Sequence, residues 1–205
     1  LAFTLPNLFR RMLGEGTLTS AFIPVFSETI EKKSIGEGLS LLNKVLTRLS
    51  LGLLAILACG VCLAFLAEMF AWPVSPKWRL GIDLCSVTLP YLLVICLSAL
   101  IVGALNVRRK FVPGAVSPII LNLSMIATLT VTGFAFDLAG EDLALALCVA
   151  VLVGGLLQLL VPFFSLRLLD GWKARFDLGG SEDLSRIREL FVVGAFGAAV
   201  GQVNV

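Results

Sequence analysis

Long apolar runs without charge constrain the fold of this chain more than any other feature. The clearest of them, Leu49–Ala67, contains no charged residue. A helix needs about 20 apolar residues to cross the hydrocarbon layer of a bilayer, so this run predicts a membrane span. The whole chain is 58% hydrophobic and 15% charged, whereas soluble domains carry about 25% charged residues. We therefore expect an all-α, polytopic helical membrane protein.

Six segments of this kind follow one another, separated by short polar connections. We expect spans at about 1–27, 49–67, 84–107, 111–136, 143–166 and 190–205, forming a single transmembrane helical region over 1–205. Residues 167–189 are expected to form a cytoplasmic amphipathic connection, in which Trp172–Phe176 is a candidate for a segment along the membrane surface. Ser181 followed by two carboxylates predicts a capped helix start. Both ends lie in apolar runs, so we expect a piece of a longer protein.

Lysine and arginine concentrate in alternate connections, which predicts the orientation of the helices. Basic residues are frequent in cytoplasmic loops, and here they gather in the first, third and fifth connections. The basic triplet Arg108–Lys110 in the third connection is interpreted as a topology signal and a phospholipid contact. The odd connections are therefore predicted to be cytoplasmic, and the first segment to run from the outside inward.

The composition excludes several classes of chemistry. The chain has no histidine, which removes histidine-based nucleophilic catalysis and histidine zinc sites. Its five cysteines lie in apolar runs, where we interpret them as packing residues. No basic patch with interleaved aromatic residues indicates nucleic-acid binding. We therefore expect no enzyme, no metal, no cofactor and no nucleic-acid partner.

The first apolar segment holds three charges: Arg10, Arg11 and Glu15. A charge near the bilayer centre costs about 2.5–3.5 kcal/mol on insertion scales. If a straight helix ends near Glu28, Arg10 lies about 27 Å and Glu15 about 20 Å from that end. Helix geometry leaves two interpretations of the arginines open, an interfacial anchor and a cavity site. A short acidic side chain snorkels poorly, so Glu15 favours a cavity.

Two single polar residues lie within later spans, Asn122 and Gln158. Hydrogen bonding between helices is one interpretation, worth about 0.6 kcal/mol on average. Lining of a cavity is the other.

The stretch Leu5-Pro-Asn-Leu-Phe-Arg-Arg-Met-Leu-Gly-Glu-Gly16, followed by Ala21-Phe-Ile-Pro24, resembles the MurJ/MviN family of lipid II flippases. The family pattern is roughly L-P-N-x-x-R-R-x-x-x-E-G, then A-F-x-P. Supporting similarity continues through Pro90-Tyr91, Gly103–Asn106, Leu121–Ile126 and Val153–Gln158.

This resemblance implies part of the N-terminal lobe of a two-lobed transporter of the MOP superfamily, from its second helix to the start of its seventh. Such a transporter moves lipid II, an undecaprenyl-pyrophosphate-linked disaccharide peptide, from the cytoplasmic to the outer leaflet by alternating access, for cell wall synthesis. It implies a bacterial inner-membrane location, contact with membrane lipids, and other cell wall synthesis proteins as candidate partners.

The resemblance also assigns candidate roles in this stretch. Arg10 matches a cavity arginine for the pyrophosphate, Arg11 matches its neighbour, and Asn7 would hydrogen-bond near the same cavity. Glu15 matches an acidic residue of a gating contact. The alternatives are a related polysaccharide-lipid or multidrug exporter of the same superfamily, and a membrane scaffold that transports nothing. Glu15 is the one acidic residue well inside an apolar run, which disfavours an ion-coupled drug antiporter.

Overall fold

The structure is a computed structural model that describes residues 16–69, 76–136 and 140–203. These ranges form α-helices and contain no strand, which confirms the all-α prediction. The helices are α2 (Thr17–Lys32), α3 (Ile35–Met69), α4 (Pro76–Val107), α5 (Val112–Ala135), α6 (Gly140–Asp170) and α7 (Glu182–Val203).

Four of these helices are long and apolar enough to cross a membrane, within Ile35–Leu63, Leu84–Val107, Val112–Phe134 and Gly140–Asp170. The polytopic membrane prediction is thereby confirmed. Helix α5 shows the expected lipid-facing surface most clearly, because large apolar side chains along it are exposed. They are Val116, Ile119, Leu123, Ile126, Leu129, Val131 and Phe134. Lipid tails solvate such side chains as well as a protein interior does.

Several helices are longer than their apolar runs. Helix α3 begins at Ile35, well before the uncharged run at Leu49. The polar residues before this run are also helical, and they pack against another part of the chain. Helix α4 begins at Pro76, inside the stretch expected to be a loop between the second and third spans. Apolar length therefore indicates where a helix crosses the membrane but underestimates how far the helix continues.

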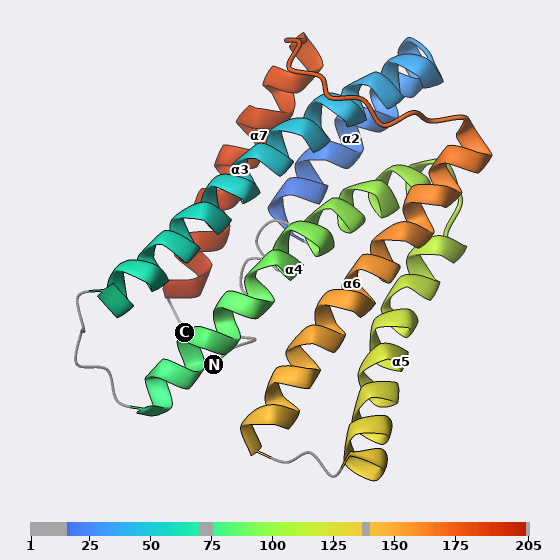
Figure 1. The fold of residues 1–205 in the computed structure, drawn as a ribbon. Helices are drawn as coiled ribbons and strands as arrows, with labels where there is room; N and C mark the ends of the chain where they lie inside the picture. Colours follow the sequence, from blue (N-terminus) through green and yellow to red (C-terminus); the bar gives the residue numbers. More distant parts are fainter. Residues whose placement is uncertain (1–15, 70–75, 137–139, 204–205) are drawn as a thin grey trace.

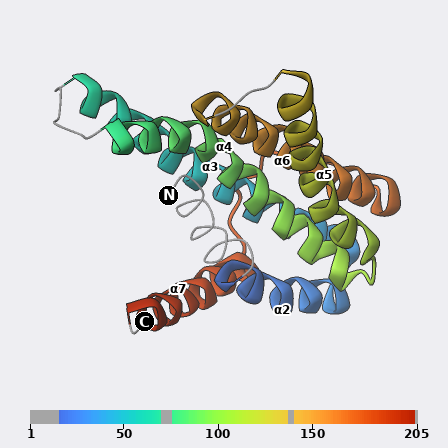
Figure 2. The ribbon, with the colours of Figure 1, turned by 90° about the horizontal axis from the view of Figure 1, so that it is seen from below.

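Helix α4 lies at the centre of the arrangement and contacts α2, α3, α5 and α6. Figures 1 and 2 show α5 and α6 side by side on one side of α4, and α2, α3 and α7 on the other. The larger core joins α2, α3 and α4 with the end of α6, and it includes the stacked rings of Phe22 and Phe26, whose centroids are 4.9 Å apart. A second core joins α3, α4 and α6 around Tyr91 and Cys96.

Adjacent glycines in α6 allow two helices to approach it closely. A Cβ atom on Gly154 would lie 2.8 Å from Cβ of Ser124 in α5, and one on Gly155 would lie 2.6 Å from Cδ2 of Tyr91 in α4. Both distances are shorter than real contacts, so each position requires glycine. Small residues of this kind bring membrane helices together where side chains would hold them apart.

The first, third and fifth connections meet at one end of the molecule, at the top of Figure 1. We call this end the basic end, because it holds Lys32, Lys33, Lys44, Arg48, Arg108, Arg109, Lys110, Arg167, Lys173, Arg175, Arg186 and Arg188. Ion pairs join its parts: Lys33 Nζ lies 2.6 Å from Asp183 Oδ2, and Lys110 Nζ lies 2.8 Å from Asp170 Oδ1. The fold thus brings together the connections that carry most of the basic residues.

The turn between α4 and α5 closes the basic end on one side. Arg109 has a φ of 57°, and its N–H donates to Asn106 O at 2.9 Å while the Lys110 N–H donates to Leu105 O at 2.9 Å. This pair of hydrogen bonds is the Schellman arrangement that ends many helices, usually with glycine in the left-handed position. Here an arginine occupies that position, and the chain reverses directly into α5.

Candidate functional site

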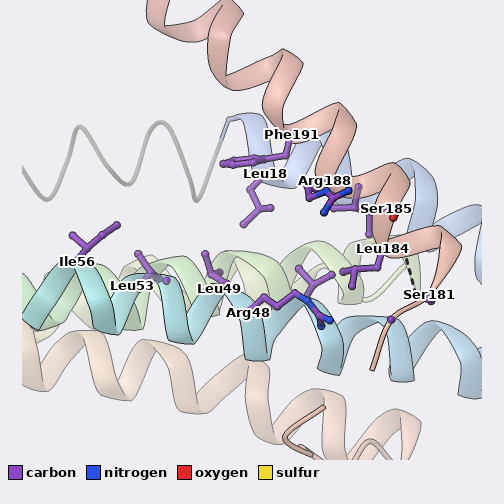
Figure 3. A pocket seen from close by; sticks show the side chains of 14 residues that line it. Leu18, Arg48, Leu49, Leu53, Ile56, Ser181, Leu184, Ser185, Arg188 and Phe191 are labelled. Carbon is purple, nitrogen blue, oxygen red and sulfur yellow. Dashed lines mark hydrogen bonds between the residues drawn. The ribbon is translucent and has the colours of Figure 1, made fainter. Parts of the chain in front are cut away.

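A cleft of about 570 Å³ opens between α3 and α7, with α2 at its side (Figure 3). We call it the α3–α7 cleft. Its lining combines apolar side chains with two arginines and two serines: Leu18, Val45, Arg48, Leu49, Gly52, Leu53, Ile56, Gly180, Ser181, Leu184, Ser185, Ile187, Arg188 and Phe191. Ligand pockets in proteins commonly measure about 300–1,000 Å³, so the cleft is large enough for a small molecule or part of a lipid.

The wall that α3 contributes is apolar and follows helical periodicity. Leu49, Leu53 and Ile56 all line the cleft, at spacings of four and three residues, which places them on one face of the helix. At about 1.5 Å per residue this face extends about 10 Å from Leu49 to Ile56. This apolar face begins next to Arg48, so the cleft is polar at one end and apolar along the rest of its length.

Arg48 is held by backbone carbonyl groups. Its guanidinium donates to Lys44 O at 3.2 Å within α3. It also donates to three successive carbonyl oxygens of the α6–α7 connection, those of Asp177, Leu178 and Gly179, at 3.4, 2.9 and 3.2 Å. An arginine presents five N–H donors in a fixed fork, and most of them are engaged here. Arg48 therefore fixes the mouth of the cleft.

Arg188 occupies a different environment. It lines the cleft from α7, is exposed, and makes no hydrogen bond or ion pair with the residues that the structure describes. Figure 3 shows its side chain between Leu18 and Ser185, beside Phe191. Its guanidinium donors therefore have no partner among the described residues and can bind a ligand in the cleft.

The α6–α7 connection, residues 171–181, forms an extended strap across the polar half of α3 (Figure 1). The buried Asn43 side chain holds it at three points: Oδ1 accepts from Trp172 Nε1 at 2.9 Å and from the Arg175 N–H at 3.4 Å, and Nδ2 donates to Lys173 O at 3.1 Å. One turn later, Thr47 Oγ1 accepts from the Asp177 N–H at 3.1 Å.

Trp172 belongs to this strap, and its position differs from the surface segment considered from the sequence. The indole is 3% exposed and packs edge-on against Phe163, with ring centroids 5.2 Å apart. The physical reason is the Asn43 amide, which accepts the indole N–H inside the protein, where a membrane surface would otherwise provide the partner.

Helix α7 starts at the predicted place. Ser181 Oγ accepts from the Leu184 N–H at 3.3 Å, and Glu182 and Asp183 occupy the first turn. The predicted capped start is therefore confirmed, and it sets the register in which Leu184, Arg188 and Phe191 share the cleft face.

Ion pairs attach this first turn to the end of α2. Arg186 Nη1 of α7 lies 2.9 Å from Glu28 Oε2 of α2. Within α2, Lys32 Nζ lies 2.6 Å from Glu28 Oε1. The hydrogen bond from Lys32, followed by that from Arg186, lowers the pKa of Glu28 below its usual value. Likewise, the hydrogen bond to Asp183 raises the pKa of Lys33. These exposed pairs orient α7 on α2 and leave Arg188 without a carboxylate among the described residues.

Four of the sequence-predicted site residues, Asn7, Arg10, Arg11 and Glu15, lie outside the described residues. They immediately precede α2, whose Leu18 lines the α3–α7 cleft.

The two remaining candidates occupy different environments. Asn122 is exposed on α5. Gln158 is 7% exposed and lines a smaller cavity of about 250 Å³ together with Ser98 and Ser117, and its Oε1 atom is buried without a hydrogen-bond partner. Asn122 is not among the described residues that line this cavity.

Sequence analysis did not single out Arg188 or Asn43. The sequence does contain a signal that could have identified Arg188. It stands four residues after Leu184 and three before Phe191, and so interrupts an apolar face of the helix. Asn43 carried none, since its partners lie about 130 residues away in the chain. Among the described residues, no three histidine, cysteine, aspartate or glutamate side chains gather as metal ligands.

Comparison with known proteins gives a consistent result over the whole chain. The family model described as the lipid II flippase MurJ matches residues 1–205. A probable lipid II flippase MurJ of Rickettsia prowazekii is 34% identical over 178 residues, which cover 83% of this chain and 33% of the relative. One of Haemophilus influenzae is 31% identical over 218 residues, which cover 98% of this chain and 41% of the relative. This chain therefore spans about a third to two fifths of the length of these relatives.

Proposed function

Because this chain belongs to the lipid II flippase MurJ family, we propose that it forms part of the first lobe of a transporter that carries lipid II across the bacterial inner membrane. The transporter moves the lipid from the cytoplasmic to the outer leaflet by alternating access and breaks no covalent bond. The basic end faces the cytoplasm, as the distribution of lysine and arginine predicts.

The amphiphilic lining of the α3–α7 cleft is the observation that best supports this role. An apolar wall of α3 and a free arginine of α7 share one cleft. Such a lining fits anionic lipids as a class, and lipid II belongs to this class. A scaffold that binds partner helices would be expected to present packing surfaces without an unpaired cation.

Within this proposal, Arg10 supplies a cation for the pyrophosphate of the substrate. The guanidinium group stays charged at every relevant pH and offers a fork of donors that matches phosphate oxygens. Arg11 and Asn7 assist binding from the same stretch, and Glu15 takes part in gating. Gln158 lines a neighbouring cavity between helices, and Asn122 remains a cavity-lining candidate.

The test is lipid II transport by the full-length protein carrying Arg10→Ala or Arg10→Lys, with membrane insertion verified. We expect Arg10→Ala to abolish transport and Arg10→Lys to retain part of it, because lysine keeps the charge but loses the fork. Arg167→Ala is the matched control, since Arg167 is an exposed arginine of α6 outside the proposed site. Unimpaired transport by both Arg10 variants would refute the role.

Cysteine labelling at positions 7 to 15 separates a transporter from a scaffold. A water-filled cavity gives labelling along one helical face, whereas a packed scaffold helix gives little labelling at any of these positions.

A further inference from the structure

The charge distribution of the α3–α7 cleft indicates a ligand of defined sign. Its charged lining residues are Arg48 and Arg188, and no carboxylate is among the described residues that line it. Asp183, in the first turn of α7, is already paired with Lys33. An anion entering the cleft therefore meets positive charge without a competing negative group.

The two arginines have separate roles. Arg48 donates to carbonyl groups of its own helix and of the strap, so its charge contributes to the field but few of its donors are free. Arg188 makes no such bonds with described residues and stands beside the Ser185 hydroxyl (Figure 3). A phosphate group bound here would take its hydrogen bonds from Arg188, which matches phosphate oxygens in pairs.

The apolar part of the cleft indicates that the ligand also carries an apolar chain. Leu49, Leu53 and Ile56 extend away from the arginines along α3, within a helix that is long and apolar enough to cross the membrane. A free phosphate ion would leave this wall exposed to water, whereas an acyl chain would cover it. Burial of this apolar surface by an acyl chain would favour binding.

We propose that the α3–α7 cleft is a binding site for an anionic phospholipid of the surrounding membrane. The headgroup phosphate lies against Arg188, and an acyl chain covers the face of Leu49, Leu53 and Ile56. The occupant is a phospholipid and not lipid II, whose pyrophosphate is assigned above to Arg10, and the inference does not require that the protein transports anything.

Gly52 provides a direct means of blocking the acyl part of the site. It lines the cleft, and a Cβ atom built on it meets no atom within 4 Å. The Cβ atom of Gly52→Phe would therefore meet no protein atom, and the ring would add bulk to the wall of the cleft. Gly133 in α5 is the matched control, because a Cβ atom there also meets nothing within 4 Å, and it lies outside the cleft.

The experiment measures lipid retention by the purified full-length protein, using native mass spectrometry and titration with short-chain phosphatidylglycerol or phosphatidylcholine. The variants are Arg188→Ala, Arg188→Lys and Gly52→Phe. Arg167→Ala controls for the loss of an exposed arginine, and Gly133→Phe controls for the added ring. Inorganic phosphate and pyrophosphate are tested as competitors.

We expect Arg188→Ala to weaken phosphatidylglycerol binding about tenfold, as the loss of a charge-assisted pair implies. Arg188→Lys should weaken it less. Gly52→Phe should weaken it without any change at Arg188, and both control variants should bind like the wild type. Inorganic phosphate in millimolar excess should displace little lipid.

Three outcomes would overturn the proposal. The first is equal binding by Arg188→Ala and Arg167→Ala. The second is equal binding by Gly52→Phe and Gly133→Phe. The third is full displacement of the lipid by inorganic phosphate or pyrophosphate, which would indicate a site for free anions. Loss of lipid II transport in the Arg10 variants has no bearing on these results, so the two proposals fail separately.

Discussion

The Lys110 ammonium group in the α4–α5 turn lies 2.8 Å from the Asp170 carboxylate at the end of α6. Arg108 contacts the same oxygen at 3.1 Å. The Asp170 side chain is 3% exposed, whereas the two cations are about a quarter exposed, at 27% and 25%. One nearly buried carboxylate therefore joins the turn between two helices to the end of a third.

Asp170→Asn should destabilise the protein, because it leaves two partly buried cations without their counter-charge. Removal of one partner from a fully buried ion pair costs about 3–5 kcal/mol, and the partial exposure of the cations reduces the expected cost to about 2 kcal/mol. Unfolding of the full-length protein in detergent measures the effect. Glu141→Gln, at an exposed carboxylate of the same helix, is the control. Equal unfolding of the two variants would contradict a structural role for Asp170.

Asn43→Leu should release the strap from α3. One buried and two partly buried hydrogen bonds end on this amide, and leaving buried groups of this kind unsatisfied costs about 1–3 kcal/mol each. Trypsin cleaves after lysine and arginine, so cleavage after Lys173 and Arg175 should accelerate markedly. Asn122→Leu, at an exposed asparagine of α5, should leave the cleavage rate unchanged. A rate in Asn43→Leu no faster than in this control would show that other contacts hold the strap.

Glu28→Gln should reduce stability at neutral pH but not at low pH. Hydrogen bonds from Lys32 and then Arg186 lower the pKa of Glu28 in the folded protein, whereas an unfolded glutamate has a pKa of about 4.3. The stabilisation is therefore complete above that value and disappears as the pH falls through the lower folded pKa. The measurement is the difference in melting temperature between wild type and variant from pH 7 to pH 3.

The difference in melting temperature at each pH separates the contribution of Glu28 to stability from the contributions of other groups. The neighbouring Lys33–Asp183 pair is present in both proteins, so its contribution cancels in the subtraction. Glu31→Gln, at an exposed residue on the same helix, is the control for the loss of a carboxylate and should differ little from wild type at pH 7. A Glu28→Gln difference that stays constant down to pH 3 would disprove the linkage.

Gly155→Val should force α6 away from α4. A Cβ atom at position 155 would lie 2.6 Å and 2.8 Å from ring atoms of the buried Tyr91, and overpacking of this kind costs about 1–3 kcal/mol. Gly133→Val, where the added atom meets nothing within 4 Å, should be neutral or slightly stabilising. Thermal unfolding in detergent compares the two, and similar melting temperatures would mean that Tyr91 moves aside easily.

The sequence predicts the helices of this fold well because their signals are local. The uncharged run Leu49–Ala67 requires a span, and Ser181 with its two following carboxylates marks the start of α7. The sequence places Lys44 and Arg48 at the entrance of this span and counts them with the first connection. In the structure this half is helical, and its residues Asn43, Thr47 and Arg48 hold the strap, which no local pattern shows.

The site was less predictable for the same reason. Arg108 and Lys110 have the pattern of a topology signal, and nothing near them in the chain indicates that Asp170 is their partner. Arg48 and Arg188 are equivalent in a count of basic loop residues. Their difference lies in which carbonyl groups surround each one, and that depends on how α3, α7 and the strap meet in space.

The strap also has a mechanical consequence. A connection of eleven residues, from 171 to 181, would ordinarily allow the following helix to move independently. Here its backbone is hydrogen-bonded to two successive turns of α3 at Asn43, Thr47 and Arg48. This restricts the independent movement of α7. The last of these attachments before α7 joins Arg48 to the carbonyl groups of Leu178 and Gly179. A rotation of α7 would therefore be transmitted to α3 at Arg48 and not to the end of α6.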